Sequence, residues 1–131
     1  MQSEFTDKAK AALAQAAKCA KSLKQGYIGT EHILVGLLAE QTGVAAKVLA
    51  DNGVDIDQVR DMIRDLIAFE KGVSLKEREG YSPRARKILE EAHRQAERFG
   101  QQQTGTEHLL IALIKEGENV AVRLLNTLSI N

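Results

Sequence analysis

The sequence predicts an all-α fold, a pseudo-twofold helical bundle of two tandem repeats with about seven helices. A shift of 76 residues pairs segment 5–55 with segment 81–131 without a gap, and fifteen of the fifty-one pairs are identical. Within both segments, apolar residues recur at spacings of three and four, which is the period of a helix. No stretch alternates with a period of two, so no strand is expected. Because two copies are too few for an open solenoid, we expect a closed domain.

The first repeat is expected to hold four helices. The first helix follows an N-cap at Thr6 and ends at Gly26, and the second follows an N-cap at Thr30. A short third helix stops near residues 52–53, and the fourth opens at Asp55. The apolar stripe of the first helix comprises Ala9, Ala12, Leu13, Ala16, Ala17, Ala20 and Leu23.

The second repeat restarts the pattern at Ser82, an N-cap that is followed by a proline at the first helical position. Thr106 is expected to cap the next helix, and the last helix begins near Asn119. The positions that repeat the first apolar stripe are Ala85, Ile88, Leu89, Ala92, Ala96 and Phe99.

We expect the two repeats to form a single domain over residues 1–131. The first repeat covers about 5–69 and the second about 81–131, while the charged segment of about 70–80 has no sustained period and is expected to be a linker. The second repeat stops before any counterpart of the fourth helix. We therefore expect less cover over Leu113, Ile114 and Leu124.

The composition disfavours several classes of protein. The 18 Lys and Arg balance the 18 Asp and Glu without a basic block, so no nucleic-acid partner is expected. No run of about 18 apolar residues is present, so no membrane partner is expected. The N-terminal residues lack the basic and apolar regions of a signal peptide, which makes a cytoplasmic location the default expectation. The single cysteine, Cys19, excludes an internal disulfide and is expected to pack within a helix.

A catalytic site is the weaker prediction. His32, His108 and His93 are the candidates for a catalytic base, but none has a serine or cysteine nucleophile at helical spacing. No paired metal-ligand pattern and no phosphate-binding GxxxxGK[S/T] loop is present. We therefore assign no catalytic residue, no metal site and no cofactor to this chain. A small hydrolase that uses His32 or His108 is the alternative from a different class.

A binding function is better supported, beginning with two helix starts. Thr6 and Ser82 occupy equivalent positions, where free N–H groups and the helix dipole favour an anion. Lys10 and Arg86 follow four residues later, about one turn above the cap and on the same side. A hydroxyl, free N–H groups and a cation together predict a phosphate cradle.

The motif Gly-Thr-Glu-His occurs unchanged in both repeats and adds an acid. Glu31 and Glu107 each lie in the first turn of a helix, and a carboxylate binds a guanidinium group through two parallel hydrogen bonds. The same residues can also be explained by their roles in the fold, without a ligand. Serine and threonine caps and first-turn glutamates stabilise helices without any ligand. Gly29 and Gly105 are typical of positions that need a special backbone conformation.

Both repeats carry F/Y-T/S-x-x-A-K/R, then G-T-E-H-I/L-L, then V-A-x-K/R-x-L. This pattern closely resembles the double Clp N-terminal domain, also called the Clp R domain, of ClpC-type Hsp100 AAA+ unfoldases. The likeness covers residues 5–131. It implies a bundle of two four-helix repeats that docks substrates and adaptors at the head of an ATP-driven ring. ATP and Mg²⁺ would bind only in ATPase modules beyond Asn131.

The resemblance also implies recognition of phosphorylated arginine at two equivalent sites. The implied roles are guanidinium binding by Glu31 and Glu107, phosphoryl contact by Thr6 and Ser82, and a flanking cation from Lys10 and Arg86. Each acid is expected to lie close to the helix start of its own half. The implied partners are phosphoarginine-marked or unfolded proteins, MecA-type adaptors and, through the full-length protein, ClpP. The alternative is a Clp N-terminal module that docks adaptors without phosphoarginine recognition.

Overall fold

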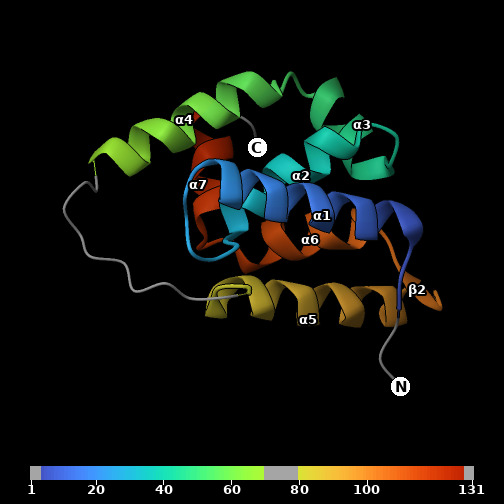
Figure 1. Cartoon of the computed structure of the whole chain (residues 1–131). Coiled ribbons are helices and arrows are strands. Elements are labelled where there is room, and N and C mark those ends of the chain that lie inside the picture. The colour runs from blue at the N-terminus through green and yellow to red at the C-terminus, as the bar shows by residue number, and fades with distance from the viewer. Residues whose placement is uncertain (1–3, 70–79, 129–131) are drawn as a thin grey trace.

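Seven helices form one bundle in the computed structural model, which describes residues 4–69 and 80–128 (Figure 1). They are α1 Asp7–Ser22, α2 Thr30–Glu40, α3 Val44–Asp51, α4 Ile56–Phe69, α5 Pro83–Arg98, α6 Thr106–Glu116 and α7 Val120–Thr127. Two strands of two residues each, β1 Glu4–Phe5 and β2 Gln103–Thr104, precede α1 and α6. The all-α prediction is confirmed. Apart from Gly80, the predicted linker of 70–80 lies outside the described residues.

The centre of the bundle is α2, which is buried from Thr30 to Leu38 and contacts each of the other six helices. α1 packs closely against α2 because Gly36 has no side chain. A Cβ at Gly36 would lie 2.1 Å from the carbonyl oxygen of Ala12. Among the described residues no single helix has the length and apolarity to span a membrane. α2 and α3 meet that criterion only jointly, across a bend of 94°.

The N-termini of α1 and α5 confirm the caps that the sequence predicts. Thr6 Oγ1 accepts the N–H of Ala9 at 3.1 Å, and Ser82 Oγ accepts the N–H of Ala85 at 3.1 Å. The C-terminus of α1 differs from the prediction, because the helix ends at Ser22 and not at Gly26. The reversal takes place at Lys24, which adopts a φ of 58° although it is not a glycine.

Thr30 and Thr106 are not the N-caps that the sequence predicts. Gly29 and Gly105 hold the cap positions, and each threonine is the first residue of its helix. The threonine hydroxyls instead serve the opposite repeat. Thr106 Oγ1 accepts the N–H of Ala45 at 3.3 Å, and Thr30 Oγ1 accepts the N–H of Ala121 at 3.4 Å. Each motif therefore helps to cap the short helix, α3 or α7, of the other repeat.

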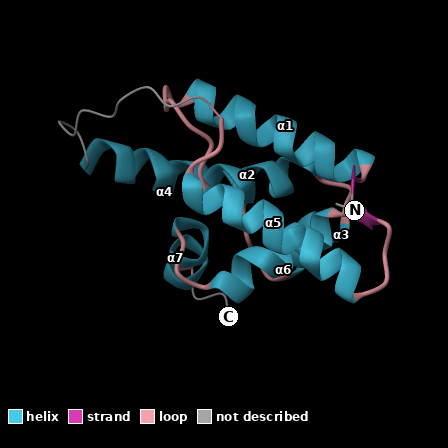
Figure 2. Cartoon of the chain, turned by 90° about the horizontal axis from the view of Figure 1, so that it is seen from below, coloured by secondary structure: helices cyan, strands magenta, loops and turns pink. Residues whose placement is uncertain are grey.

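The two strands contradict the expectation of a chain without strands. β1 and β2 pair in parallel, with Phe5 opposite Thr104. In Figure 2 this pair lies beside the start of α1, close to the N-terminus of the chain. An equivalent single bridge joins Ile28 to Tyr81. Segments of two residues are too short to show an alternating pattern, so sequence periodicity does not detect them.

Three apolar positions of the second repeat differ from the prediction in how far they are buried. Leu113 and Leu124 were expected to be less covered but are buried in the core, at 0% and 4% exposure, whereas Ile114 is 57% exposed as expected. Phe99 was placed in the apolar stripe of α5 but is 61% exposed. It occupies the C-cap position, where the chain already leaves the helical stripe.

We predict that the threonines of the two motifs stabilise the fold through the opposite repeat. Replacing Thr106 by valine keeps the shape of the side chain but removes the acceptor of the Ala45 N–H. The free energy of unfolding should fall by about 1 kcal/mol for Thr106→Val, and similarly for Thr30→Val, when measured by urea denaturation. Thr127→Val changes a hydroxyl at an exposed helix end and should alter stability by less than about 0.5 kcal/mol. Equal effects at all three positions would contradict this role.

Candidate functional site

The predicted site residues come together across the two repeats. The backbone N–H of Thr6, at the start of α1, donates to the carbonyl oxygen of Thr104 at 2.9 Å. Gly105 and Glu107 follow directly in the chain. The start of α1, which carries Lys10, therefore lies beside the acidic motif of the second repeat.

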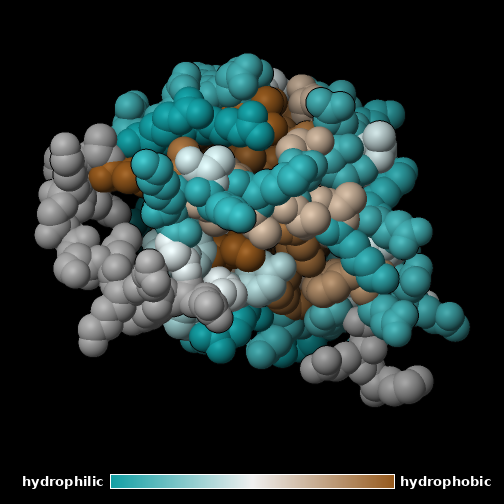
Figure 3. Space-filling view, viewed as in Figure 1, coloured by the Kyte–Doolittle hydropathy of each residue, from teal (hydrophilic) through white to brown (hydrophobic). Residues whose placement is uncertain are grey.

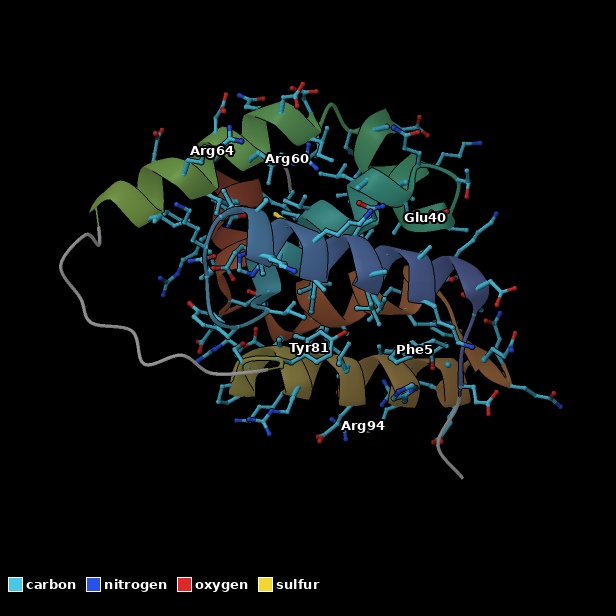
Figure 4. The ribbon with its side chains drawn as sticks, viewed as in Figure 1. Phe5, Glu40, Arg60, Arg64, Tyr81 and Arg94 are labelled. Carbon is cyan, nitrogen blue, oxygen red and sulfur yellow. The ribbon has the colours of Figure 1, made fainter. Side chains whose placement is uncertain are left out.

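The second site is the pseudo-twofold counterpart of the first. The N–H of Ser82, at the start of α5, donates to the carbonyl oxygen of Ile28 at 2.9 Å, and Gly29 and Glu31 follow. Figure 4 shows the residues that precede the two helix starts, Phe5 and Tyr81, at separate points along α5. Both sites are therefore composite, with the helix start from one repeat and the acid from the other.

This arrangement corrects the expected pairing of each acid with the helix start of its own half. Glu31 lies close enough to Cys19 for its charge to raise the pKa of that thiol. Cys19 follows Thr6 by thirteen residues on α1, which corresponds to about 20 Å of helix. Glu31 thus lies towards the far end of α1 from Thr6. The backbone contacts therefore group Thr6 and Lys10 with the motif of Glu107, and Ser82 and Arg86 with the motif of Glu31.

Both glutamate carboxylates fold back over the glycine of their own motif. A Cβ at Gly105 would lie 1.9 Å from Oε1 of Glu107, and a Cβ at Gly29 would lie 2.1 Å from Oε1 of Glu31. The two glycines have φ values of −96° and −99°, which any residue can adopt. The interpretation of these glycines as special backbone positions is therefore wrong. They are glycines because a side chain would displace the carboxylate.

The two motif histidines are buried structural groups. Nδ1 of His32 accepts the N–H of Gly29, and Nδ1 of His108 accepts the N–H of Gly105, both at 2.8 Å. Both rings are at most 2% exposed. Burial lowers the pKa of His32 to about 4, so at neutral pH the ring is uncharged and its Nδ1 remains an acceptor. These contacts account for both histidines without any catalytic role.

The cations at the two helix starts are exposed. Neither Lys10 nor Arg86 forms an ion pair or a hydrogen bond through its side chain with another residue in the described part of the chain. Both are therefore available to an anionic guest. Within residues 4–69 and 80–128, no three His, Cys, Asp or Glu side chains are grouped to hold a metal ion.

Sequence reasoning missed a cluster that belongs to the Thr6 site alone. Nδ1 of His93 lies 2.6 Å from Oγ1 of Thr104, and the ring of Phe5 lies 4.6 Å from the ring of His93. Burial lowers the pKa of His93, with an opposing contribution from the charge of Glu97. The repeat alignment pairs His93 with Ala17 and Thr104 with Ile28, so no internal duplication marked the contact between His93 and Thr104.

Apolar surface is available between the repeats as well. A groove of about 370 Å³ between α4 and α7 is lined by Met62, Asp65, Leu66, Val120, Arg123, Leu124 and Thr127. A smaller groove of about 120 Å³ separates α3 from α6 and α7. In Figure 3, apolar residues also gather in the band between α1 and α5.

The chain matches a known protein family over nearly its whole length. Residues 4–128 match the model of the Clp repeat (R) N-terminal domain. The chain belongs to this Clp N-terminal domain family. It is 40% identical over 127 residues to the negative regulator of genetic competence ClpC/MecB of Bacillus subtilis, and 39% identical over 127 residues to the chaperone protein ClpB of Oceanobacillus iheyensis. These alignments cover 97% of this chain but only 15% and 16% of those relatives.

Solved structures show the same fold for this Clp N-terminal domain. The N-terminal domain of the caseinolytic protease associated chaperone ClpD of Arabidopsis thaliana aligns with a TM-score of 0.80 and 24% identity, over 98% of this chain and 89% of that one. The ClpV N-domain in its complex with a VipB peptide aligns with a TM-score of 0.73 and 22% identity, over 98% of this chain and 79% of that one. At these identities the likeness establishes the fold alone.

We predict that His32 makes the stability of the domain depend on pH between about 6.5 and 4. The pKa of His32 is about 4 in the folded chain and about 6.5 in an unfolded chain, so the unfolded state binds more protons in this window. Stability is therefore complete above pH 6.5 and falls as the pH is lowered, by about 2 kcal/mol between pH 7 and pH 5. Urea denaturation at these two pH values measures the loss.

Matched variants separate this effect from other titrations. His32→Gln should remove most of the pH dependence, because glutamine does not titrate. His93→Gln should remove a smaller part, since His93 is less buried than His32. The same pH dependence in wild type and His32→Gln would contradict the assignment.

Proposed function

We propose that this Clp N-terminal domain recognises substrates and adaptors for a larger Clp-type ATP-dependent unfoldase, and that it binds phosphoarginine-marked proteins at the two composite sites. The observation that supports the proposal is the backbone contact of each helix start with the segment before the acidic motif of the opposite repeat, Thr6 with Thr104 and Ser82 with Ile28. The relatives are several times longer than this chain, so ATP and Mg²⁺ binding and work with ClpP belong to the proposal for the whole protein.

The chemistry of phosphoarginine fits this combination. Its phosphoryl group is an anion, which the free N–H groups and dipole of a helix start favour. Thr6 Oγ1 already accepts the N–H of Ala9, so its own O–H is left to donate to a phosphoryl oxygen. Lys10 adds a positive charge one turn further along. Ser82 and Arg86 supply the same groups at the second site.

The guanidinium part of phosphoarginine distinguishes it from other phosphorylated side chains. Glu107 presents a carboxylate beside the helix start of α1, and a carboxylate binds a guanidinium group in a planar, two-point arrangement. A phosphoserine has no cation to place there, and its phosphate would be repelled by the acid. The glutamates therefore favour the arginine adduct over simpler phosphate esters.

We predict that each cation acts on the acidic motif of the other repeat. In an NMR titration with free phosphoarginine, the amides of Gly105 and Glu107 should report one site, and those of Gly29 and Glu31 the other. Lys10→Ala should weaken binding about tenfold at Gly105 and Glu107 and leave the other site unchanged, because it removes one charge-assisted contact of about 1.4 kcal/mol.

The reciprocal variant and a control complete this experiment. Arg86→Ala should weaken binding only at Gly29 and Glu31. Lys18→Ala removes a lysine from α1 two turns beyond Lys10 and should change neither site. Weakening at Glu31 in the Lys10→Ala variant would contradict the composite sites, and an absence of shifts at all four amides would contradict phosphoarginine binding.

A second candidate function is adaptor docking without phosphoarginine recognition, and the groove between α4 and α7 favours it. Met62, Leu66 and Leu124 line this groove with apolar side chains, and Asp65 and Arg123 add charged ones. The solved ClpV N-domain binds a VipB peptide, so a domain with this fold accommodates a protein segment. A MecA-type adaptor is the partner that the resemblance of the chain to ClpC suggests.

We predict that Leu66→Asp weakens a complex with a MecA-type adaptor about tenfold, because it places a charge in an apolar contact. Leu66 is already 39% exposed, so the fold should tolerate the change. Ile114→Asp is the matched control, since Ile114 is exposed but does not line this groove. Binding measured by calorimetry that is equally sensitive to both changes, or to neither, would contradict docking at this groove.

A further inference from the structure

A side chain on α5 joins the two short strands that lie next to the Thr6 site. Nδ1 of His93 lies 2.6 Å from the hydroxyl oxygen of Thr104 on β2. The ring of Phe5, on β1, packs against the same imidazole with the ring centroids 4.6 Å apart, and Figure 4 shows Phe5 close to α5. Phe5 and Thr104 lie opposite one another in the parallel pair. His93 therefore contacts both strands at the same pair of residues.

The hydroxyl of Thr104 depends on His93 for its hydrogen bond. Thr104 is fully buried, at 0% exposure, and within the described part of the chain its hydroxyl bonds to His93 alone. An uncharged imidazole has one donor and one acceptor nitrogen, and a hydroxyl can take either role, so the two groups match in both tautomers. Removal of the imidazole would leave a buried hydroxyl without its partner, which is costly.

The pairing of β1 with β2 determines where the start of α1 lies. The N–H of Thr6 donates to the carbonyl oxygen of Thr104 at 2.9 Å, and Thr104 directly precedes Gly105 of the acidic motif. Each strand has only two residues, and a short two-stranded pair is marginally stable by itself. His93 adds a hydrogen bond to one strand and an aromatic contact to the other. These two contacts therefore help to keep the helix start beside the motif.

The equivalent junction before α5 is held differently. In the repeat alignment, Ala17 takes the place of His93, and Ala17 is exposed. Ile28 takes the place of Thr104, so neither partner of the hydrogen bond has a polar counterpart. The bridge between Ile28 and Tyr81 consequently forms without a side-chain hydrogen bond at these two aligned positions. The side-chain junction is a property of the Thr6 site.

We propose that His93 is a positioning residue of the composite site formed by Thr6, Lys10 and the motif of Glu107. It holds β1 against β2 and so keeps the phosphate-binding helix start beside the motif that carries the acid. This inference rests on the proposed binding of phosphoarginine. It makes the Thr6 site, and not the Ser82 site, dependent on a side chain that acts on the guest through the strands.

The physical quantity that His93 controls is the fraction of molecules in which β1 is paired with β2. A guest that needs the helix start and the acid together binds only to this fraction, so its apparent dissociation constant rises as the fraction falls. Hydrogen exchange of the Thr6 amide reports the opening of the pair directly. Binding reports only the loss of the paired fraction, so the change in affinity is smaller than the change in exchange rate.

Two NMR measurements on the whole chain test this role with the variant His93→Ala. The Thr6 amide should exchange with solvent about tenfold faster than in the wild type, because a buried hydrogen bond is lost, whereas the Ser82 amide should keep its rate. In a titration with free phosphoarginine, the dissociation constant reported by Gly105 should rise about threefold. The constant reported by Gly29 should not change.

A paired replacement distinguishes positioning from a general loss of stability. His93→Phe keeps a ring beside Phe5 but leaves the Thr104 hydroxyl without its partner, so it should weaken binding as His93→Ala does. The double variant His93→Phe with Thr104→Val replaces both partners by apolar groups, which is nearly neutral. It should bring the dissociation constant back to within about twofold of the wild type. Arg94→Ala, at the exposed neighbour on α5, is the control and should change neither site.

The outcomes separate this inference from the function on which it rests. The role of His93 would be overturned, while phosphoarginine binding stands, if His93→Ala accelerated exchange equally at Thr6 and Ser82. A double variant that binds more weakly than His93→Phe alone would overturn it as well. If the wild-type chain gives no response to phosphoarginine at either site, the proposed function fails and the inference fails with it.

Discussion

Both candidate sites depend on backbone hydrogen bonds between the two repeats. The segment before α1 pairs with the segment before α6, and the segment before α5 pairs with the segment before α2, each through N–H···O bonds of 2.9 Å. These bonds place the start of one repeat's first helix beside the acidic motif of the other repeat. The hydroxyls of Thr30 and Thr106 add contacts of the same crossed kind. Neither repeat could therefore assemble a site by itself.

Each residue of the Gly-Thr-Glu-His motif has a separate physical role in this arrangement. The glycine leaves space for the carboxylate, and the threonine hydroxyl accepts an N–H from the opposite repeat. The histidine ring accepts the buried N–H of the glycine, which would otherwise lack a partner. The glutamate is the remaining residue of the motif, and in the proposed function it binds the guanidinium group of the guest. Three structural residues would then hold one binding side chain.

Much of the fold could be predicted from the sequence because its signals are local. The apolar stripes, the caps at Thr6 and Ser82 and the start of α7 at Asn119 all depend on residues within a few positions of one another. The repeat of 76 residues also predicts two copies of any site. Strands of two residues leave no such signal, and the end of α1 was misplaced because Lys24 adopts a conformation usually taken by glycine.

The pairing of the site residues could not be predicted by the same route. An internal repeat shows that Thr6 matches Ser82 and that Glu31 matches Glu107, but it is equally compatible with pairing within a repeat and between repeats. The choice depends on long-range contacts such as that of Thr6 with Thr104.

A crystal structure of the domain with phosphoarginine bound would test the central claim most directly. The account predicts that the ligand at the start of α1 places its phosphoryl group at Thr6 and Lys10 and its guanidinium group at Glu107, so that one ligand touches both repeats. A ligand whose phosphoryl and guanidinium groups are both held by residues of the same repeat would contradict it.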